Sequence, residues 1–339
     1  MSDPIYSYDE MMSDDDYARP HEEAGYKLHG GFDAEGRYVS PRMKVRSPAV
    51  DEWRERMVAR GGGLIDADET LLAGETFPSY PQTKLMLQSG IDQGIWNSLT
   101  ITGVIEARGR ALLDYPAPDL QKIIVDDISA MAAGHLAKGL LHAHGMDEGG
   151  DPASDRGAHD AMWFAVRDTV FGKGAYPLPE VPENIGRPDS DRREIPDIPA
   201  EYEQLILLMM NVLMIEIRAE MIFDYYCKLL GDPDLFSAKR EAAEWGVEIV
   251  NRIRQDEAIH VGYLQLVLSE LRGCTFKTTD GKQVAGSELI DPVWERMVHW
   301  HAVDNPKLQR EQSRKDVEAR ILTHPRGDEI LAEFRALED

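Results

Sequence analysis

The chain has 339 residues, of which 37 are Lys or Arg and 61 are Asp or Glu, and its formal charge is -24. Because nucleic-acid binding and docking to anionic membranes depend on basic groups, this balance argues against both partners. Two cysteines, Cys227 and Cys274, without a CxxC pair argue against a disulfide scaffold. The acidic N-terminus lacks the apolar stretch of a secretory signal. We therefore expect a cytoplasmic protein.

The first 85 residues predict an extended polar arm. They are rich in Gly, Pro, Asp and Tyr, and the segments GGF and RGGGLID are typical of turns. One short helix is expected here, near residues 50–60. The predicted organisation is thus an arm over 1–85, a helical core over 86–273 and a tail over 274–339.

The core predicts an all-α fold built from long helices in two pairs. The four long helices are expected over residues 91–113, 120–144, 200–230 and 236–272, the last of them ended by Gly273. A shorter amphipathic helix is expected over 155–171. Between the two pairs lies a Pro-rich connector over 173–198. Connectors this long often cover or gate a site, so we hypothesise that it forms a lid.

The tail predicts a hairpin followed by short charged helices. Residues 274–284 have a turn signal at Asp280-Gly281, which is typical of a β-hairpin. The charged helices are expected over 289–337. The longest apolar run of the whole chain, near 205–215, is too short to cross a membrane and predicts a buried helix.

The helix expected over 236–272 carries two metal-capable side chains inside its apolar stripe. Steps of three and four residues place on one face Ile249, Ile253, Glu257, His260, Leu264, Leu268 and Leu271. A carboxylate in a dry core is costly unless it is paired or binds a metal. Glu257 and His260 lie one turn apart and aim at one point, as in dimetal carboxylate bundles. The neighbouring Asp256 either orients a histidine from behind or faces water.

The other long helices show the same anomaly. Glu216 and Glu220 continue the apolar stripe of 200–230, and Glu106 replaces an apolar residue in the stripe of 91–113. Glu216 and Glu220 need not both bind metal, because one of them could instead pair with an arginine on a neighbouring helix. His135 and His142 share a face of 120–144. For His135 the alternative is a core histidine bonded to a backbone carbonyl.

This arrangement resembles the ferritin-like superfamily of dimetal-carboxylate proteins. That family places a Glu on the first core helix, Glu-x-x-His on the second, a Glu on the third and Glu-x-x-His on the fourth. Glu106 matches the first position, Glu220 or Glu216 the third, and Glu257 with His260 the fourth. The resemblance covers about residues 90–272. It implies a ferritin-like four-helix bundle with a long crossover.

The second helix departs from the family pattern. Ala132 stands three residues before His135, where the family has a bridging Glu. Three outcomes stay open: a site with one metal ion, a site that recruits His142 or His159, and a degenerate site. The predicted ligand set is Glu106, His135, Glu216, Glu220, Glu257 and His260.

The resemblance implies a non-haem oxidoreductase that activates dioxygen to oxidise a small organic substrate. Carboxylate and imidazole ligands suit iron, as two ions or one, with manganese as the alternative. No Gly-x-Gly-x-x-Gly fingerprint is present, so electrons would come from a donor protein or from the substrate. Long apolar helices often pair, which predicts a homodimer. The alternative functions are a ferritin-like scaffold or binding subunit with an incomplete metal site and, less favoured, iron storage.

Overall fold

The computed structural model describes residues 5–13, 17–72, 77–188 and 192–338. Parts of the predicted arm, at 1–4, 14–16 and 73–76, and residues 189–191 of the predicted connector lie outside these ranges. Within them the chain is mostly helical, and its strands form three two-stranded hairpins. The all-α prediction is confirmed, while the ferritin-like bundle stays a prediction.

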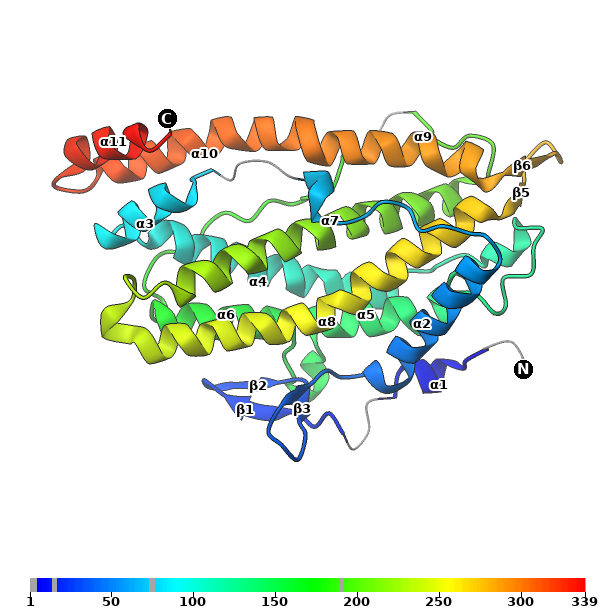
Figure 1. The fold of residues 1–339 in the computed structure, drawn as a ribbon, viewed down its shortest axis with the longest axis horizontal. Coiled ribbons are helices and arrows are strands. Elements are labelled where there is room, and N and C mark those ends of the chain that lie inside the picture. Colours follow the sequence, from blue (N-terminus) through cyan, green and yellow to red (C-terminus); the bar gives the residue numbers. More distant parts are fainter. Residues whose placement is uncertain (1–4, 14–16, 73–76, 189–191, 339) are drawn as a thin grey trace.

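Five helices build the bundle that holds the candidate site (Figure 1). They are α4 (Gln93–Gly109), α5 (Leu140–Gly149), α6 (His159–Val170), α7 (Ala200–Gly231) and α8 (Arg240–Gly273). α7 packs along α8, and α4 packs against both α5 and α6. In Figure 1, α5 and α6 follow one another along one row. Together they take the place of a single helix that is interrupted between Gly149 and His159.

α7 and α8 are long and unbroken, and their bounds lie within a few residues of the predicted ones. α7 is rich in Leu, Ile and Met, and Glu201 and Glu203 in its first turn complement the positive end of the helix dipole. It ends at Gly231, just before Pro233, which cannot continue a helix. α8 buries an apolar face along its whole length and ends at Gly273.

The helix predicted over 120–144 is wrong. The segment contains two 3₁₀ turns, Leu120–Lys122 and Ala132–Lys138, and α5 begins only at Leu140. The first predicted helix is also shorter than expected, because α4 gives way to a 3₁₀ segment at Arg110–Asp114. The bundle therefore contains two long helices rather than four.

Side chains outside the segment and glycines within it explain the irregular backbone before α5. Glu270 of α8 accepts hydrogen bonds from the backbone N–H groups of Ala132 (3.2 Å) and Ala133 (2.9 Å), which replace helical bonds. Gly139 has a φ of 120°, a conformation that residues with a side chain rarely adopt. Helical periodicity alone does not reveal such long-range partners.

The N-terminal arm is more structured than predicted. Its elements are α1 (Tyr8–Met11), β1 (His21–Glu23), β2 (Tyr26–Leu28), β3 (Gly31–Phe32), β4 (Tyr38–Val39), α2 (Met43–Ala59), a 3₁₀ turn (Glu69–Leu72) and α3 (Tyr80–Gln88). The hairpins pair β1 with β2 and β3 with β4. α2 packs on α8 and buries Ala49, Val50 and Trp53 in the main core, so the arm is part of the folded body.

The tail contains the predicted hairpin, β5 (Thr275–Lys277) paired with β6 (Gln283–Ala285). It continues as α9 (Gly286–His299), a π-helical turn (Trp300–Asp304), α10 (Asn305–Leu322) and α11 (Gly327–Ala336). α9 packs against α7 and α8. Among the helices that the structure describes, none has the length and apolar content needed to cross a membrane.

Candidate metal centre

Seven buried carboxylates and histidines meet in the middle of the bundle as two overlapping groups. The first group is Glu106, Glu148, His159 and Glu257. The second group is His144, Glu148, Glu216 and His260. In each group the four ligand-type atoms lie within 4.8 Å of one another. Glu148 belongs to both groups, so the two groups form one cluster.

Four of the six predicted ligands lie in this cluster. Glu257 and His260 stand one turn apart on α8, Glu216 comes from α7 and Glu106 from α4. All four are buried in spite of their polarity. The helical periodicity that placed them inside apolar stripes therefore located these residues correctly in space.

Three members of the cluster were missed or left open by the sequence. His144 and Glu148 lie one turn apart on α5, and His159 is the first residue of α6. His159 was named as an alternative ligand, whereas His144 and Glu148 fell at and beyond the predicted end of their helix. The spacing His-x-x-x-Glu just before a Gly-Gly pair is the sequence signal that would have found them.

The interruption between α5 and α6 brings Glu148 and His159 together. The chain leaves the row after Gly149 and turns back through a bridge between Asp151 and Arg156. His159 Nδ1 then lies 3.5 Å from Glu148 Oε1, although eleven positions separate the two residues. The pair thereby brings a carboxylate and an imidazole together in the cluster.

The first group converges on the Nδ1 atom of His159. This nitrogen lies 2.9 Å from Glu257 Oε1 and 3.8 Å from Glu106 Oε2. Glu106 also accepts a hydrogen bond of 3.1 Å from the indole N–H of Trp163. The group therefore contains three carboxylates and one imidazole, a donor set of mostly hard oxygen atoms.

The second group is built around two stacked imidazoles. The rings of His144 and His260 lie 3.7 Å apart and 10° from parallel. His144 Nε2 is 3.0 Å from Glu216 Oε1 and 3.5 Å from Glu148 Oε1, and His260 Nδ1 is 3.4 Å from the same Glu148 atom. His260 Nδ1 also lies 2.7 Å from Glu257 Oε2, which ties the second group to the first.

Three buried atoms of the cluster lie close together without forming a hydrogen bond of good geometry. They are Glu148 Oε1, His159 Nδ1 and Glu257 Oε1. Buried polar atoms in proteins are almost always hydrogen-bonded. Here three such atoms lie at the point where the groups converge, which is the arrangement expected of ligands to a cation.

Without added cations, ionising all the carboxylates of the cluster would cost more free energy than ionising the same groups in water. Burial and the charge of Glu148 raise the pKa of Glu106 well above its ordinary value. Burial and the charge of Glu257 raise the pKa of Glu216 to about 8. Although burial opposes it, the charge of His260 lowers the pKa of Glu257 to about 2. Two divalent cations would neutralise the four glutamates and remove this repulsion.

Each histidine of the cluster is oriented by a partner on its far nitrogen. Asp256 lies 3.2 Å from His159 Nε2, and Asp147 lies 3.2 Å from His260 Nε2. The hydroxyl of Tyr263 is 2.8 Å from Nδ1 of His144. Such outer partners fix the ring and strengthen it as a metal ligand. For Asp256 this is the first of the two roles proposed from the sequence.

Two predicted ligands lie outside the cluster, which corrects their predicted place. His135 sits in the 3₁₀ turn, with Nδ1 2.7 Å from the carbonyl of Met131 and Nε2 accepting from the backbone N–H of Tyr6 at 3.1 Å. It is the core histidine given above as the alternative. Glu220 faces outward on α7 and pairs with Arg254 of α8. His142 is also elsewhere, with Nδ1 3.0 Å from the hydroxyl of Tyr8.

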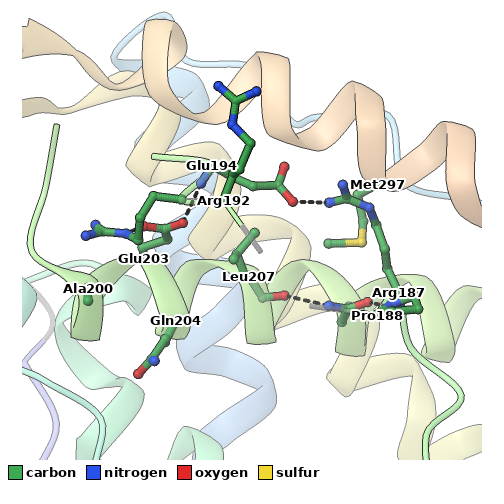
Figure 2. Close-up of a pocket in the computed structure, with 11 residues that line it drawn as sticks. Arg187, Pro188, Arg192, Glu194, Ala200, Glu203, Gln204, Leu207 and Met297 are labelled. Atoms are coloured by element: carbon green, nitrogen blue, oxygen red, sulfur yellow. Dashed lines mark hydrogen bonds and ion pairs between the residues drawn. The ribbon is translucent and has the colours of Figure 1, made fainter. Parts of the chain in front are cut away.

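The predicted connector lines a pocket away from the cluster (Figure 2). The pocket has a volume of about 300 Å³ and lies between residues 187–188 and 192–194 of the connector, the start of α7 and Met297 of α9. Its lining contains two ion pairs: Arg187 bonds Glu194 (Figure 2), and Arg193 bonds Glu203. None of the residues that line this pocket belongs to the cluster.

Comparisons with models of protein families, with curated proteins and with solved structures gave no match to this chain. The ferritin-like resemblance and the function inferred from it therefore depend on this chain's own residues.

Proposed function

We propose that this protein is a non-haem dimetal oxidoreductase, with iron or a mixture of iron and manganese, that activates dioxygen to oxidise a small organic substrate. The observation that carries the proposal is the buried cluster of four glutamates and three histidines, three of whose atoms converge without a hydrogen bond of good geometry. The family pattern has a carboxylate at the position where this chain has Ala132. The proposal extends the ferritin-like resemblance, because another residue of the cluster supplies a carboxylate.

The donor set fits a pair of such ions. Glu106 and His159 would hold one ion, and His144, Glu216 and His260 the other. Glu148 is close to both groups, and Glu257 contacts a histidine of each, so these two carboxylates are suited to bridging. Oxygen and imidazole donors favour iron or manganese over copper(I), which prefers sulfur.

The bound metals would supply the electron-transfer chemistry with dioxygen, and the chain supplies the enclosure. The cluster lies between two apolar cores, one containing Leu213, Ile217 and Leu264 and the other containing Trp163 and Ile253. These side chains exclude water from the site and so protect reactive oxygen species from side reactions. Electrons would come from a donor protein or from the substrate.

The scaffold alternative loses its main support. It was based on the absent glutamate at Ala132, and Glu148 provides a carboxylate at the cluster in its place. The lid hypothesis for the connector also finds no support in the described residues of that segment, because the pocket they line does not include the cluster.

Metal content and oxygen uptake test the proposal. The purified protein, the double variant Glu257→Ala/His260→Ala and the matched variant Glu220→Ala are loaded with ferrous iron without oxygen and analysed by mass spectrometry. We expect about two ions per chain in the wild type and in Glu220→Ala. We expect few or none in the double variant.

The loaded wild type should then consume dioxygen rapidly, and the double variant should not. About one ion per chain would point to a mononuclear site. A wild type that holds no metal, even after reconstitution under reducing conditions, would overturn the oxidoreductase and leave the scaffold.

A further inference from the structure

Two buried aspartates stand behind the cluster and hold two of its histidines. Asp256 is 3.2 Å from Nε2 of His159, and Asp147 is 3.2 Å from Nε2 of His260. In both rings this leaves Nδ1 facing the glutamates. Both aspartates have zero solvent exposure. The side chains that contact them, rather than water, therefore determine the charge that each aspartate presents to its histidine.

The N-terminal arm supplies further partners of both aspartates. Asp256 lies 3.1 Å from Nε2 of His29 and accepts a hydrogen bond of 3.1 Å from the hydroxyl of Tyr38. Arg42 and Arg46 both bind Asp147, the latter at 2.6 Å. These four side chains belong to one stretch, residues 29–46, which the sequence analysis left without a role.

The fold fixes this stretch on the interruption between α5 and α6. Gly157 accepts a hydrogen bond of 2.9 Å from the N–H of His29 and donates one of 2.9 Å to the carbonyl of Lys27. Gly30, at a φ of 70°, turns the chain so that a side chain there would overlap the ring of Tyr38. The arm is therefore hydrogen-bonded to the same loop that brings Glu148 and His159 together.

The charges also limit what these residues bind. His29, His159 and Asp256 are close enough to hold a cation of their own. However, the four glutamates of the cluster and the two aspartates behind it carry six negative charges when ionised, and two guanidiniums oppose them, which leaves four. Two divalent ions balance these charges, and a third would leave buried excess charge. The arm residues thus act as partners of the ligands.

The two aspartates are unequal because their arm partners differ. Asp147 is bound by two guanidiniums, which always carry a positive charge and offset its own. Asp256 is bound by an imidazole and a phenol, and it therefore keeps more of its negative charge for His159. A more negative partner makes an imidazole a stronger donor to its metal. The three carboxylates of the first group also add negative charge next to His159.

We propose that the N-terminal arm is a working part of the metal centre: His29 and Tyr38 position His159, Arg42 and Arg46 position His260, and the difference between the pairs makes the two metal positions unequal. This inference rests on the proposed function. It assigns the four arm residues as positioning residues, because none of them touches the reacting atoms.

The test compares metal release from the full-length, metal-loaded protein with a chelator in excess. The variants are His29→Ala/Tyr38→Phe and Arg42→Met/Arg46→Met, and the control is Arg37→Gln on an exposed turn of the same arm. In the wild type and control we expect two ions per chain and slow release. Each double variant should release one ion roughly 10–100-fold faster and retain the other.

Anomalous diffraction from crystals taken after partial release identifies the emptied position. It should be the position at His159 in His29→Ala/Tyr38→Phe and the position at His260 in Arg42→Met/Arg46→Met. Circular dichroism and thermal melting of the metal-free proteins show whether each variant is folded. If the arginine variant does not fold, His29→Ala/Tyr38→Phe decides the question, with Tyr38→Phe alone as its mildest form.

Release at the wild-type rate from folded variants would overturn the role of the arm and leave the dimetal function standing. Equal acceleration of both ions in a folded variant would overturn the assignment of arm residues to separate positions. A wild type without metal would instead overturn the proposed function, and the role of the arm with it.

Discussion

The two sides of the bundle deliver their metal-capable residues in different ways. On one side, α7 and α8 are continuous, and Glu257 and His260 meet because they lie one helical turn apart. On the other side, Glu148 lies in the last turn of α5 and His159 begins α6, and they meet because the chain leaves the row between them and returns. One side relies on local geometry and the other on a loop.

This difference indicates which parts of the site tolerate substitutions and which parts are sensitive to them. A helix fixes the spacing of its residues through its own backbone hydrogen bonds. The junction of α5 and α6 depends on partners far away in the sequence, such as the N-terminal arm that pairs with Gly157. Substitutions at the junction should therefore disturb the site more than equivalent ones on α7 or α8.

The largest effect is expected for Glu148→Ala. Glu148 is the residue that belongs to both groups, so its loss removes a ligand from each position at once. We expect the variant to retain neither ion after gel filtration, while Glu216→Ala, which lies in the second group alone, keeps metal at the first. Mass spectrometry of metal per chain measures both. Equal metal loss in the two variants would show that Glu148 does not link the positions.

The sequence predicted the residues whose partners follow from periodicity. Glu106, Glu216, Glu257 and His260 interrupt apolar stripes on helices that the structure contains, and their burial follows from that pattern. The prediction for His135 was wrong because Glu270 holds the surrounding segment in a 3₁₀ turn rather than in a helix.

The other failures also reflect interactions across long stretches of sequence. Glu220 lies one turn from Glu216 and follows the same stripe, but Arg254 from α8 binds it at the surface. Glu148 and His159 were not paired because no local rule predicts that a loop closes between them. The arm was read as extended because its apolar contacts, such as that of Trp53 with His135, lie far away in sequence.

The junction can be broken directly with Gly150→Ala. Gly150 has a φ of 59° and a ψ of -152°, a combination almost restricted to glycine, and an added Cβ would lie 2.2 Å from the carbonyl oxygen of Arg156. We expect a loss of unfolding free energy of about 3 kcal/mol or more, measured by denaturant titration.

The matched control for the junction is Gly231→Ala at the end of α7. A Cβ there meets no atom within 4 Å, so the change should stay within about 0.5 kcal/mol. Metal release from Gly150→Ala should also be faster than from the control. If the two variants were equally stable, the junction would not be the constrained side of the bundle.

A pH dependence should sharpen the comparison at Glu270, which holds the irregular segment before α5. Burial raises the pKa of Glu270 to about 7 from 4.5, although two backbone N–H groups oppose the shift. The folded state therefore binds the proton more tightly than the unfolded state. The stability that this provides is complete below the unfolded pKa and is lost as the pH rises towards 7.

The variant Glu270→Gln removes the titration and keeps one acceptor oxygen, so one of the two N–H groups loses its partner at every pH. Relative to the wild type it should become more stable as the pH rises, by on the order of 3 kcal/mol at most. Denaturant titrations between pH 4 and 8 measure the difference, with Glu288→Gln in the tail as the control. A difference that does not change with pH would contradict the assignment.

The smallest effect is expected for Glu220→Ala on the continuous side. Its carboxylate and the guanidinium of Arg254 are each about one-third exposed, and Asp224 also binds Arg254, at 2.7 Å, so an acidic partner remains. Partly exposed ion pairs of this kind contribute little, so we expect about 0.5 kcal/mol of destabilisation and unchanged metal content. A fall in metal content would return Glu220 to the ligand set. It would also show that α7 can present two successive turns to the same site, because Glu216 and Glu220 are separated by a single helical turn.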